Sequence, residues 1–564
     1  MKNLIKKISA YKIFWVIVFI VISLPAIYPL IRGDFYHFSD EPHIANLFEM
    51  IRAIDSGQFP PRWAPDMSFG FGYPLFSFYY PLPYYIGYLF FKLFGSLILS
   101  IKLLFLLSVL LSALFMFKWL RLFTGRFESL VGALVYIYTP YRAVDLYVRG
   151  ALGELFAFIY FPAISYFTYL LLKTGKVKYV GFLALTISFL ILSHNLAPIF
   201  FIPWIIFFAL LLCRFSLSFT NIYKFFASVL LALSASSYFW LPAFIEKSNL
   251  VSQTPFNYRD HFPFIKQLIF PSWGYGASHP GIYDDLSFQI GIVNLILISV
   301  TTLTLRMSKK NRFLKIFILF SLAGFMFLMN IRSSFVWNIL PLADYIQFPW
   351  RLLLFTTFLS SSLLMFINAK TKIVKTFLVI LGMFSISQSF FYFKPSEYFN
   401  PTDDYYLKRF LPNISVSGKS EILSSEYLNY SEDYLLLPMW VDRRANFLPD
   451  EKFTSNTVTI NEIKELNSVK YLMKISGEEE GSISFNNYYY PGWKIFVDGQ
   501  EKDIGIDKPY GNISFRILKG EKEVMALWSE TNFRKVVDLI SLCGILVIIY
   551  LITFSKRSGN NNEK

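Results

Sequence analysis

Apolar stretches of about 20 residues recur along most of this 564-residue chain, from Tyr11 to Leu551. An α-helix needs about that length to cross the ~30 Å hydrocarbon core of a bilayer. Hydrophobic residues make up 55% of the chain and aromatic residues 20%, which is more apolar than an ordinary soluble domain. The pattern predicts an all-α polytopic membrane protein, because a helix satisfies its own backbone hydrogen bonds within lipid.

Basic clusters separate the apolar stretches and account for the formal net charge of +15. Placing these clusters in the cytoplasm follows the positive-inside rule and puts both termini in the cytoplasm. The charge therefore reflects membrane topology, and we do not expect the chain to bind nucleic acid. About 12 spans are predicted, at 11–31, 99–117, 128–141, 151–172, 179–196, 198–213, 225–242, 289–305, 313–330, 350–368, 375–393 and 535–554.

These assignments divide the chain into three parts. Residues 1–393 form a transmembrane domain with a long first outer loop at 32–97, and residues 535–564 form the last helix and a cytoplasmic tail. Residues 394–534 read as an extracytoplasmic β-rich domain, because apolar and polar residues alternate and Asp498-Gly499 is a hairpin-turn signal. The two helices predicted at 179–213 must turn at Ser193-His194-Asn195. A single fused helix would reverse the membrane orientation of every later segment.

The first outer loop holds four ionisable side chains within seven positions: His37, Asp40, Glu41 and His43. Adjacent carboxylates beside histidines suit proton transfer, since like charges and partial burial raise one pKa. The same quartet could hold a divalent metal such as Mg or Mn. A structural interpretation fits the spacing as well: Asp40 would be the N-cap of an amphipathic helix that begins near Pro42.

Other polar residues of the predicted outer face are candidate substrate ligands. Two arginines of the second outer loop could clamp a phosphate, or they could form internal salt bridges with the acids beside them. A histidine at the outer end of a helix pair could be a structural donor or a ligand, and an arginine at a helix start could snorkel instead of binding. These candidates are Arg142, Asp145, Arg149, Glu154, His194 and Arg351.

Four stretches resemble the membrane family called 6-pyruvoyl-tetrahydropterin synthase-related, a neighbour of the YfhO-like proteins. They are DEPHIANLFEMIRAIDSGQFPPRW, TPYRAVDLYVRGALGELFAF, LSHNLAP and IQFPWRLL, and YYYPGWKIFVDGQ before the last helix supports the resemblance. A first helix followed at once by an Asp-Glu pair is also similar to the GT-C superfamily of membrane glycosyltransferases. The family name implies no pterin chemistry here.

The resemblance implies a glycosyltransferase that moves a sugar from a polyprenyl-phosphate donor, with inversion, to an envelope glycan, lipid or protein acceptor at the outer face. By position Asp40 matches the catalytic aspartate of the superfamily, and Glu41 matches the second acid of the pair. A different class also fits the layout: a non-catalytic flippase for a lipid-linked saccharide, or a scaffold for envelope assembly. Transport predicts ionisable residues deep in midplane helices, whereas these candidates cluster at one face.

Overall fold

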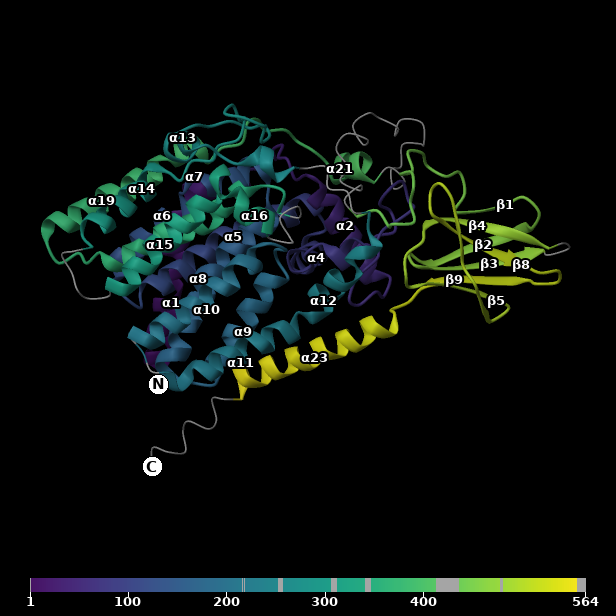
Figure 1. The fold of residues 1–564 in the computed structure, drawn as a ribbon, viewed down its shortest axis with the longest axis horizontal. Helices are drawn as coiled ribbons and strands as arrows, with labels where there is room; N and C mark the ends of the chain where they lie inside the picture. The colour runs from purple at the N-terminus through teal and green to yellow at the C-terminus, as the bar shows by residue number, and fades with distance from the viewer. Residues whose placement is uncertain are drawn as a thin grey trace.

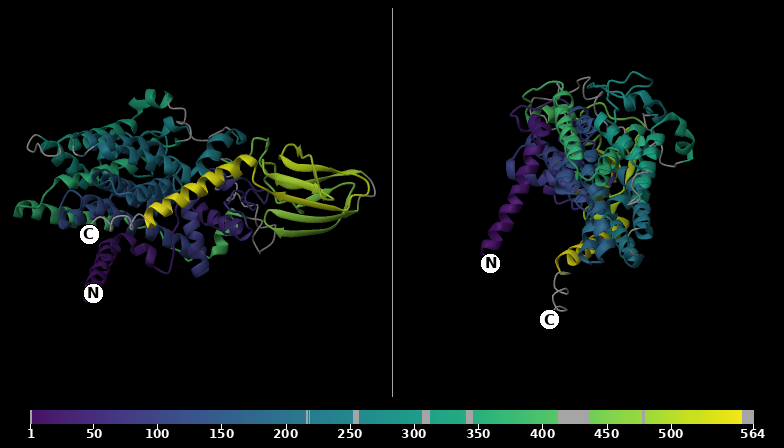
Figure 2. Two further views of the ribbon diagram at one scale, coloured as in Figure 1. Left: turned by 90° about the horizontal axis from the view of Figure 1, so that it is seen from below. Right: turned by 90° about the vertical axis from the view of Figure 1, so that its left-hand side faces the viewer.

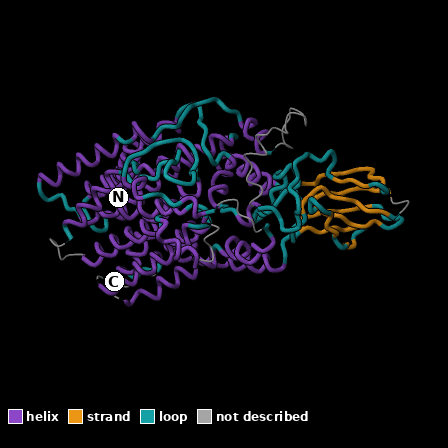
Figure 3. Tube along the Cα trace, turned by 45° about the horizontal axis from the view of Figure 1, so that its top comes forward, coloured by secondary structure: helices purple, strands orange, loops and turns teal. Residues whose placement is uncertain are grey.

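The computed structural model describes residues 2–215, 217, 219–251, 257–305, 312–339, 346–411, 436–476 and 480–554. The basic residues 306–311 and the pair 556–557 lie outside these ranges. The described chain forms a helical body with a β region at one end (Figure 1). Helices and strands do not intermix (Figure 3).

Each of the twelve stretches predicted to be helical contains a helix, because long apolar runs carry few helix-breaking residues. The corresponding helices are α1 (Lys2–Ile31), α5 (Leu97–Leu120), α6 (Arg126–Ile137), α8 (Leu152–Thr174), α9 (Lys178–Ile191), α10 (Ala197–Phe215), α11 (Ile222–Ala235) with α12 (Ser237–Ile245), α14 (Ile292–Leu303), α15 (Arg312–Leu328), α18 (Leu353–Ser362), α19 (Lys372–Ser387) with α20 (Ser389–Tyr392), and α23 (Asn532–Thr553). The predicted turn at Ser193-His194-Asn195 is confirmed, since α9 ends at Ile191 and α10 begins at Ala197.

Fewer of these helices meet the length and composition of a full membrane span. Within the described residues six helices do, or up to eight if each of two bent helix pairs is one span. Three further apolar helices are shorter, at Ile17–Ile31, Lys178–Ile191 and Ile292–Leu303. Twelve crossings therefore remain a prediction.

The first outer loop folds into short helices against the bundle. These are α2 (Pro42–Asp55), α3 (Leu75–Phe78) and α4 (Leu82–Phe94). The apolar face predicted for α2 is buried at Ile44 and Leu47, and α2 packs on α4, α5 and α21 (Asp403–Phe410). The second outer loop contains α7 (Pro140–Ala143) and a π-helical turn, η1 (Val144–Arg149), and α13 (Ile265–Ile269) and α16 (Ser334–Ile339) are short helices farther along.

The β region is a sandwich of two antiparallel sheets, with strand orders β1-β4-β8-β7 and β2-β3-β9-β5-β6. The strands are β1 (Phe453–Ser455), β2 (Thr459–Asn467), β3 (Lys470–Ser476), β4 (Gly481–Tyr488), β5 (Trp493–Val497), β6 (Gln500–Lys502), β7 (Gly505–Asp507), β8 (Asn512–Ile517) and β9 (Glu523–Trp528). The predicted hairpin turn is confirmed, because Asp498 and Gly499 join β5 to β6 with φ of 46° and 80°. Positive φ at both central residues is the signature of a type I′ turn.

The first outer loop completes the core of the sandwich. Trp63, Phe69 and Phe71 belong to the same apolar cluster as Tyr488 and Tyr490, and all five are at most 1% exposed. These tyrosines therefore fill the core of the sandwich. From the sandwich α23 runs back along the helical body and ends near the start of α1, far from the β region (Figures 1 and 2).

Candidate functional site

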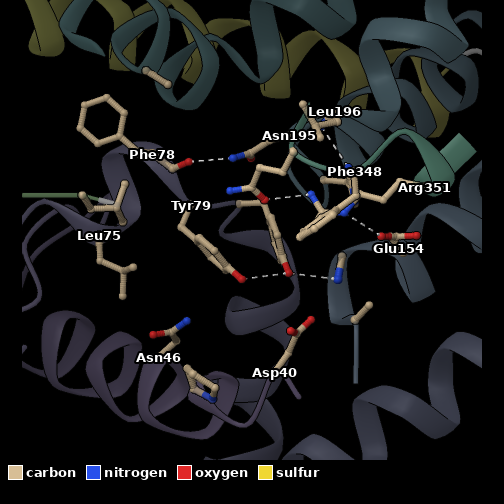
Figure 4. Close-up of a pocket in the computed structure, with 18 of the residues that line it drawn as sticks. Asp40, Asn46, Leu75, Phe78, Tyr79, Glu154, Asn195, Leu196, Phe348 and Arg351 are labelled. Atoms are coloured by element: carbon tan, nitrogen blue, oxygen red, sulfur yellow. Dashed lines mark hydrogen bonds and ion pairs between the residues drawn. The ribbon is translucent and has the colours of Figure 1, made fainter. Parts of the chain in front are cut away.

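One cavity of about 1130 Å³ collects most of the candidate residues. Segments far apart in the sequence line it: the start of α2, the Tyr79-Tyr80 stretch, η1 and the start of α8, the α9–α10 turn, and the segment before α18 (Figure 4). Six of the predicted site residues are in its wall: Asp40, His43, Arg149, Glu154, His194 and Arg351. The fold thus brings together the first and second predicted outer loops, the turn at Ser193-His194-Asn195 and the start of the helix predicted at 350–368.

Asp40 is fixed by its backbone and leaves its carboxylate free to face the cavity. Its N–H donates to the carbonyl of Arg149 at 2.7 Å, and Ser39 N–H donates to the carbonyl of Val148 at 3.0 Å. Helix α2 begins at Pro42 with Glu41 in the N-cap position, and no side-chain capping bond is made there within the described residues. The N-cap interpretation of Asp40 is therefore wrong: its side chain points into the cavity (Figure 4).

His43 lies in the first turn of α2, with a buried ring. Its Nδ1 is 2.7 Å from the hydroxyl of Tyr84, and its Nε2 is 4.0 Å from Oδ2 of Asp40. Burial lowers the pKa of His43 to about 4, against a smaller opposing effect of the Asp40 charge. The imidazole is therefore neutral at neutral pH.

Glu41 points away from the cavity into a separate contact. Its Oε1 is 2.8 Å from Nδ1 of His37, and its Oε2 is 3.2 Å from Nη1 of Arg409 on α21. The His37 ring stacks on Phe399 with 3.9 Å between ring centroids. The structure therefore does not bring Glu41 to the cavity beside Asp40.

The structure divides the quartet that the sequence offers as a possible metal site. His37 and Glu41 pair on one side, whereas Asp40 and His43 face the cavity on the other. Among the described residues no three His, Cys, Asp or Glu side chains lie close enough together to hold a metal ion. The four residues separate because His37, Asp40 and Glu41 precede α2 and only His43 lies on it, so they share no common helix face.

A buried ion network forms the wall opposite Asp40. Nη1 of Arg149 is 2.6 Å from Oδ1 of Asp145 and 2.8 Å from Oε1 of Glu154, and its guanidinium lies over the Trp350 ring at 4.8 Å. Tyr141 donates to the other oxygen of Glu154 at 2.5 Å. The predicted salt bridges are thus confirmed for Arg149, which nevertheless lines the cavity as well.

Arg142 and Asp145 do not line the cavity. Arg142 is fully buried, donates to the carbonyl of Ser108 at 3.1 Å and lies over the Phe158 ring at 4.7 Å. Asp145 is also fully buried and turns toward Arg149. The η1 turn places these neighbours on different faces, so sequence proximity to Arg149 did not imply a shared site.

His194 and Arg351 occupy the same end of the cavity as Glu154. Nδ1 of His194 accepts hydrogen bonds from the N–H groups of Leu196 and Ala197 at 3.0 and 2.9 Å, which caps α10. Nε of Arg351 is 3.5 Å from Oε1 of Glu154, and its Nη1 donates to Gln347 at 3.3 Å. Because Nδ1 of His194 is an acceptor, the proton of a neutral ring resides on Nε2.

Sequence reasoning missed several residues of the wall, among them Asn46, Tyr79, Tyr80, Gln347 and Trp350. Tyr79 and Tyr80 stack with 4.5 Å between centroids, and the hydroxyl of Tyr80 accepts from the N–H of Gly153 at 3.1 Å. The signal for these tyrosines was the aromatic stretch 70–95, which the sequence predicts to be an interfacial belt, either a surface for a lipid tail or a plain membrane anchor. In the structure part of that belt faces the polar cavity.

The other wall of the cavity is apolar and comes from α10, α11 and α12. It includes Ile199, Ile202, Pro203, Leu233 and Phe244. Ile199 is 40% exposed and Phe244 is 59% exposed, so this wall continues onto the outer surface of the helices. The cavity therefore joins a polar end to an apolar surface that lies on membrane-type helices.

Comparison with solved structures finds an arabinofuranosyltransferase, AftD from Mycobacteria. The similarity has a TM-score of 0.46 at 12% identity and covers 69% of this chain and 27% of that chain. A mutant form of the same enzyme gives a TM-score of 0.42, also at 12% identity. Similarity at this level carries no argument about activity.

Comparison at the level of sequence is more specific. Over 216 residues the chain is 24% identical to an uncharacterized protein of Lactococcus lactis subsp. cremoris, and the match spans 37% of this chain and 35% of that protein. The chain thus aligns with about a third of the length of this relative. Residues 76–396, more than half of the chain, match a domain family of membrane proteins. The protein therefore belongs to the 6-pyruvoyl-tetrahydropterin synthase related domain family of membrane proteins.

Proposed function

We propose that the protein is a membrane glycosyltransferase that uses a polyprenyl-phosphate-linked sugar and transfers it, with inversion, to a hydroxyl of an envelope glycan, lipid or protein. The observation that carries this proposal is the composition of one cavity. A carboxylate, Asp40, shares the cavity with an arginine–carboxylate network whose Arg351 is partly exposed, and an apolar wall leads out to the helix surface. A donor with a charged head and a long lipid tail has the same two-part chemistry.

The proposed reaction needs few groups. The acceptor hydroxyl attacks the anomeric carbon from the face opposite the phosphate, and the carbon–oxygen bond to phosphate breaks as the new glycosidic bond forms. Asp40 takes the hydroxyl proton, and polyprenyl phosphate leaves with the bonding electrons. Arg351 and the Nε2–H of His194 stabilise the charge that grows on the leaving phosphate.

The apolar wall supports a lipid-linked donor. Ile199, Ile202 and Pro203 on α10 and Phe244 on α12 provide a surface continuous with the membrane-facing side of the bundle. Isoprenoid chains would remain in an apolar environment along this wall while the phosphate reaches the arginines. A soluble nucleotide-sugar has no lipid chain and would gain no binding free energy from this apolar wall.

The proposed topology puts the cavity and the β region at the outer face and both termini in the cytoplasm. The start of α1 and the end of α23 lie at the same end of the helical body, away from the β region, which supports this arrangement (Figure 1). The proposal also keeps the twelve predicted crossings, the shorter and bent helices being counted as spans.

The test compares Asp40→Asn with Asp55→Asn. Asp55 is an exposed carboxylate in the same loop, paired with Lys92 and outside the cavity wall, so its substitution is a matched chemical change. Purified protein in nanodiscs would be given undecaprenyl phosphate carrying radiolabelled glucose, galactose, mannose, N-acetylglucosamine or arabinofuranose, with envelope extract as acceptor. Wild type and Asp55→Asn should transfer one of these sugars, and Asp40→Asn should be slower by about a hundred-fold or more.

The alternative class, a flippase or a scaffold, predicts a different result. Neither needs a proton acceptor, so Asp40→Asn would keep the native function, scored as restoration of envelope glycan composition in a deletion strain. Because Asp40 makes no capping bond, loss of activity in Asp40→Asn cannot arise from loss of a cap. Wild-type transfer by a folded Asp40→Asn protein would remove the catalytic assignment.

A further inference from the structure

His43 has a buried ring nitrogen that faces the cavity with no hydrogen-bond partner in the described chain. The residue is 1% exposed, its Nδ1 is engaged by Tyr84, and its Nε2 is the free atom. Buried polar atoms are nearly always paired, so an unpaired one aimed into a binding cavity indicates a ligand contact. The chemistry of that contact depends on whether Nε2 carries a proton.

The hydrogen bonds behind His43 fit a ring that is protonated at Nε2. The amide Nδ2 of Asn46 can only donate, and it donates to the hydroxyl oxygen of Tyr84 at 3.3 Å. The Tyr84 hydroxyl is 2.7 Å from Nδ1 of His43, within reach to donate its own hydrogen to that nitrogen. In this arrangement Nδ1 accepts, and the proton of the neutral imidazole resides on Nε2.

The charges around the ring support a neutral imidazole. Asp40 is the acidic group that faces it and Arg149 the basic group, and the rings of Tyr79 and Tyr84 lie beside it. Burial and Arg149 both disfavour a cationic ring, and only Asp40 favours one. His43 is thus a neutral donor whose orientation is set by Tyr84 and Asn46.

The distance from Nε2 to Asp40 identifies what fits between them. Nε2 and Oδ2 of Asp40 are 4.0 Å apart, too far for a direct hydrogen bond. An oxygen atom about 2.8 Å from each would make two hydrogen bonds that meet near a right angle. A hydroxyl group has the matching pattern: it donates its proton to the carboxylate and accepts from the imidazole N–H.

We propose that His43 is a positioning residue for the acceptor, an Nε2–H donor held by the Asn46–Tyr84 relay that places the acceptor hydroxyl against Asp40. The inference rests on the proposed function and adds to it the acceptor subsite. One lone pair of the hydroxyl oxygen accepts from His43, and another attacks the anomeric carbon. Its proton passes to Asp40, and His43 neither gains nor loses a proton in the step.

A spectroscopic experiment tests the tautomer without using activity. Protein labelled with ¹⁵N at the histidine rings and placed in liposomes at pH 7 has five histidines, and the His43→Gln spectrum identifies the signals of His43. Wild type should show His43 as a neutral ring protonated at Nε2. Tyr84→Phe removes the hydroxyl that fixes the tautomer and should give a mixture of both neutral forms. A wild-type ring protonated at Nδ1, or at both nitrogens, would overturn the proposal.

A matched pair of substitutions tests the role in positioning. His43→Gln places an amide N–H near the position of Nε2, whereas His43→Asn places it near Nδ1, and both lose the native ring. With the sugar donor that wild type uses, kcat/KM for the acceptor should stay within about three-fold in His43→Gln. It should fall about thirty-fold in His43→Asn, the scale expected for losing one donor to a substrate. The KM for donor should change little in either variant.

The two proposals fail in different ways. Absence of transfer by the wild-type protein with every donor in the panel contradicts the proposed function, whatever the spectrum shows. If wild type is active, equal losses in His43→Gln and His43→Asn contradict the positioning role and leave Asp40 as base. Circular dichroism and monodisperse elution of each variant ensure that the comparison concerns folded protein.

Discussion

Two buried arginine–carboxylate clusters in this protein differ in how completely they are paired. At the junction of helices and sandwich, Arg62 donates to Glu530 at 3.1 Å, to the carbonyl of Tyr238 at 2.6 Å and to Asp538 at 2.8 Å. In the same junction, Nε and Nη2 of Arg534 contact the carboxylate of Glu246 at 2.9 and 2.7 Å.

The cavity cluster is more open. The Arg351 side chain is 24% exposed, against 1% for Arg62 and 0% for Arg534. Its contacts to Glu154 and Gln347 are long, at 3.5 and 3.3 Å. The comparison teaches that the same residue types hold two parts of the protein together in one place and leave donors available for a ligand in the other. Exposure and contact length thus distinguish Arg351, which we propose to bind a ligand, from the arginines Arg62 and Arg534 that hold the junction together.

The largest effect is expected from breaking the junction. Arg534→Leu leaves Glu246 buried without its bidentate partner, and removing one member of a buried ion pair costs about 3 kcal/mol or more. Equilibrium unfolding in mixed micelles should show a loss of that size in the free energy of unfolding. Arg351→Leu should change this free energy by less than about 1 kcal/mol, because its side chain is partly exposed and loosely paired.

The double variant Glu246→Leu with Arg534→Leu is the control for that experiment. Removing both charges leaves an apolar pair in an apolar setting, so most of the lost stability should return. A single variant as stable as wild type would mean that the junction does not depend on this pair, and the distinction between the clusters would fail.

An intermediate effect is expected in the pH dependence of folding stability, and it arises from His43 in the cavity wall. Burial lowers the pKa of His43 to about 4, whereas an unfolded histidine titrates near 6.5. Between these values the unfolded state binds a proton that the folded state does not, so folding stability falls as the pH falls from about 6.5 to about 4. Over this range the free energy of unfolding of His43→Gln should fall by about 2 kcal/mol less than that of wild type.

Unfolding free energies at pH 7 and pH 4.5 measure this difference. The double variant Glu246→Leu with Arg534→Leu serves as the comparison, because it alters the junction without leaving an unpaired carboxylate and keeps His43 in place, and its pH dependence should match that of wild type. Parallel pH profiles for wild type and His43→Gln would show that the ring is not held neutral.

The smallest effect concerns binding at the open cluster. Arg351→Lys keeps the charge but removes the fork that matches phosphate oxygens, so the KM for the polyprenyl-phosphate donor should rise about ten-fold, with kcat for the bound donor reduced less. Arg142→Lys is the matched control: the same change at a buried arginine outside the cavity wall. Its donor KM should equal that of wild type.

A rise in donor KM in Arg142→Lys, with none in Arg351→Lys, would reverse the assignment of the open and closed arginines. Both arginines are candidates in the sequence, and the structure alone distinguishes them. The steady-state assay would use the donor identified with the wild-type protein, at saturating acceptor.

Patterns among neighbouring residues predicted most of the secondary-structure elements. Twelve helical stretches, the α9–α10 turn and the Asp498-Gly499 hairpin all appear in the structure, because length, hydrophobicity and turn chemistry act over neighbouring residues. The same local reasoning failed at the start of α2. It placed Asp40 as an N-cap and grouped it with Glu41 and the two histidines, whereas Glu41 instead contacts Arg409, more than three hundred positions away.

The sequence by itself determined the class of protein and its family resemblance. It also named ten candidate residues, of which six share one cavity in the structure. Only the tertiary structure decided which side chains meet. Four candidates, His37, Glu41, Arg142 and Asp145, lie outside the cavity wall, and Tyr79 and Tyr80 line it instead. Side-chain direction at a site depends on contacts between distant segments, such as the bond from Asp40 N–H to the Arg149 carbonyl. Periodicity and charge in a linear chain carry no record of those contacts.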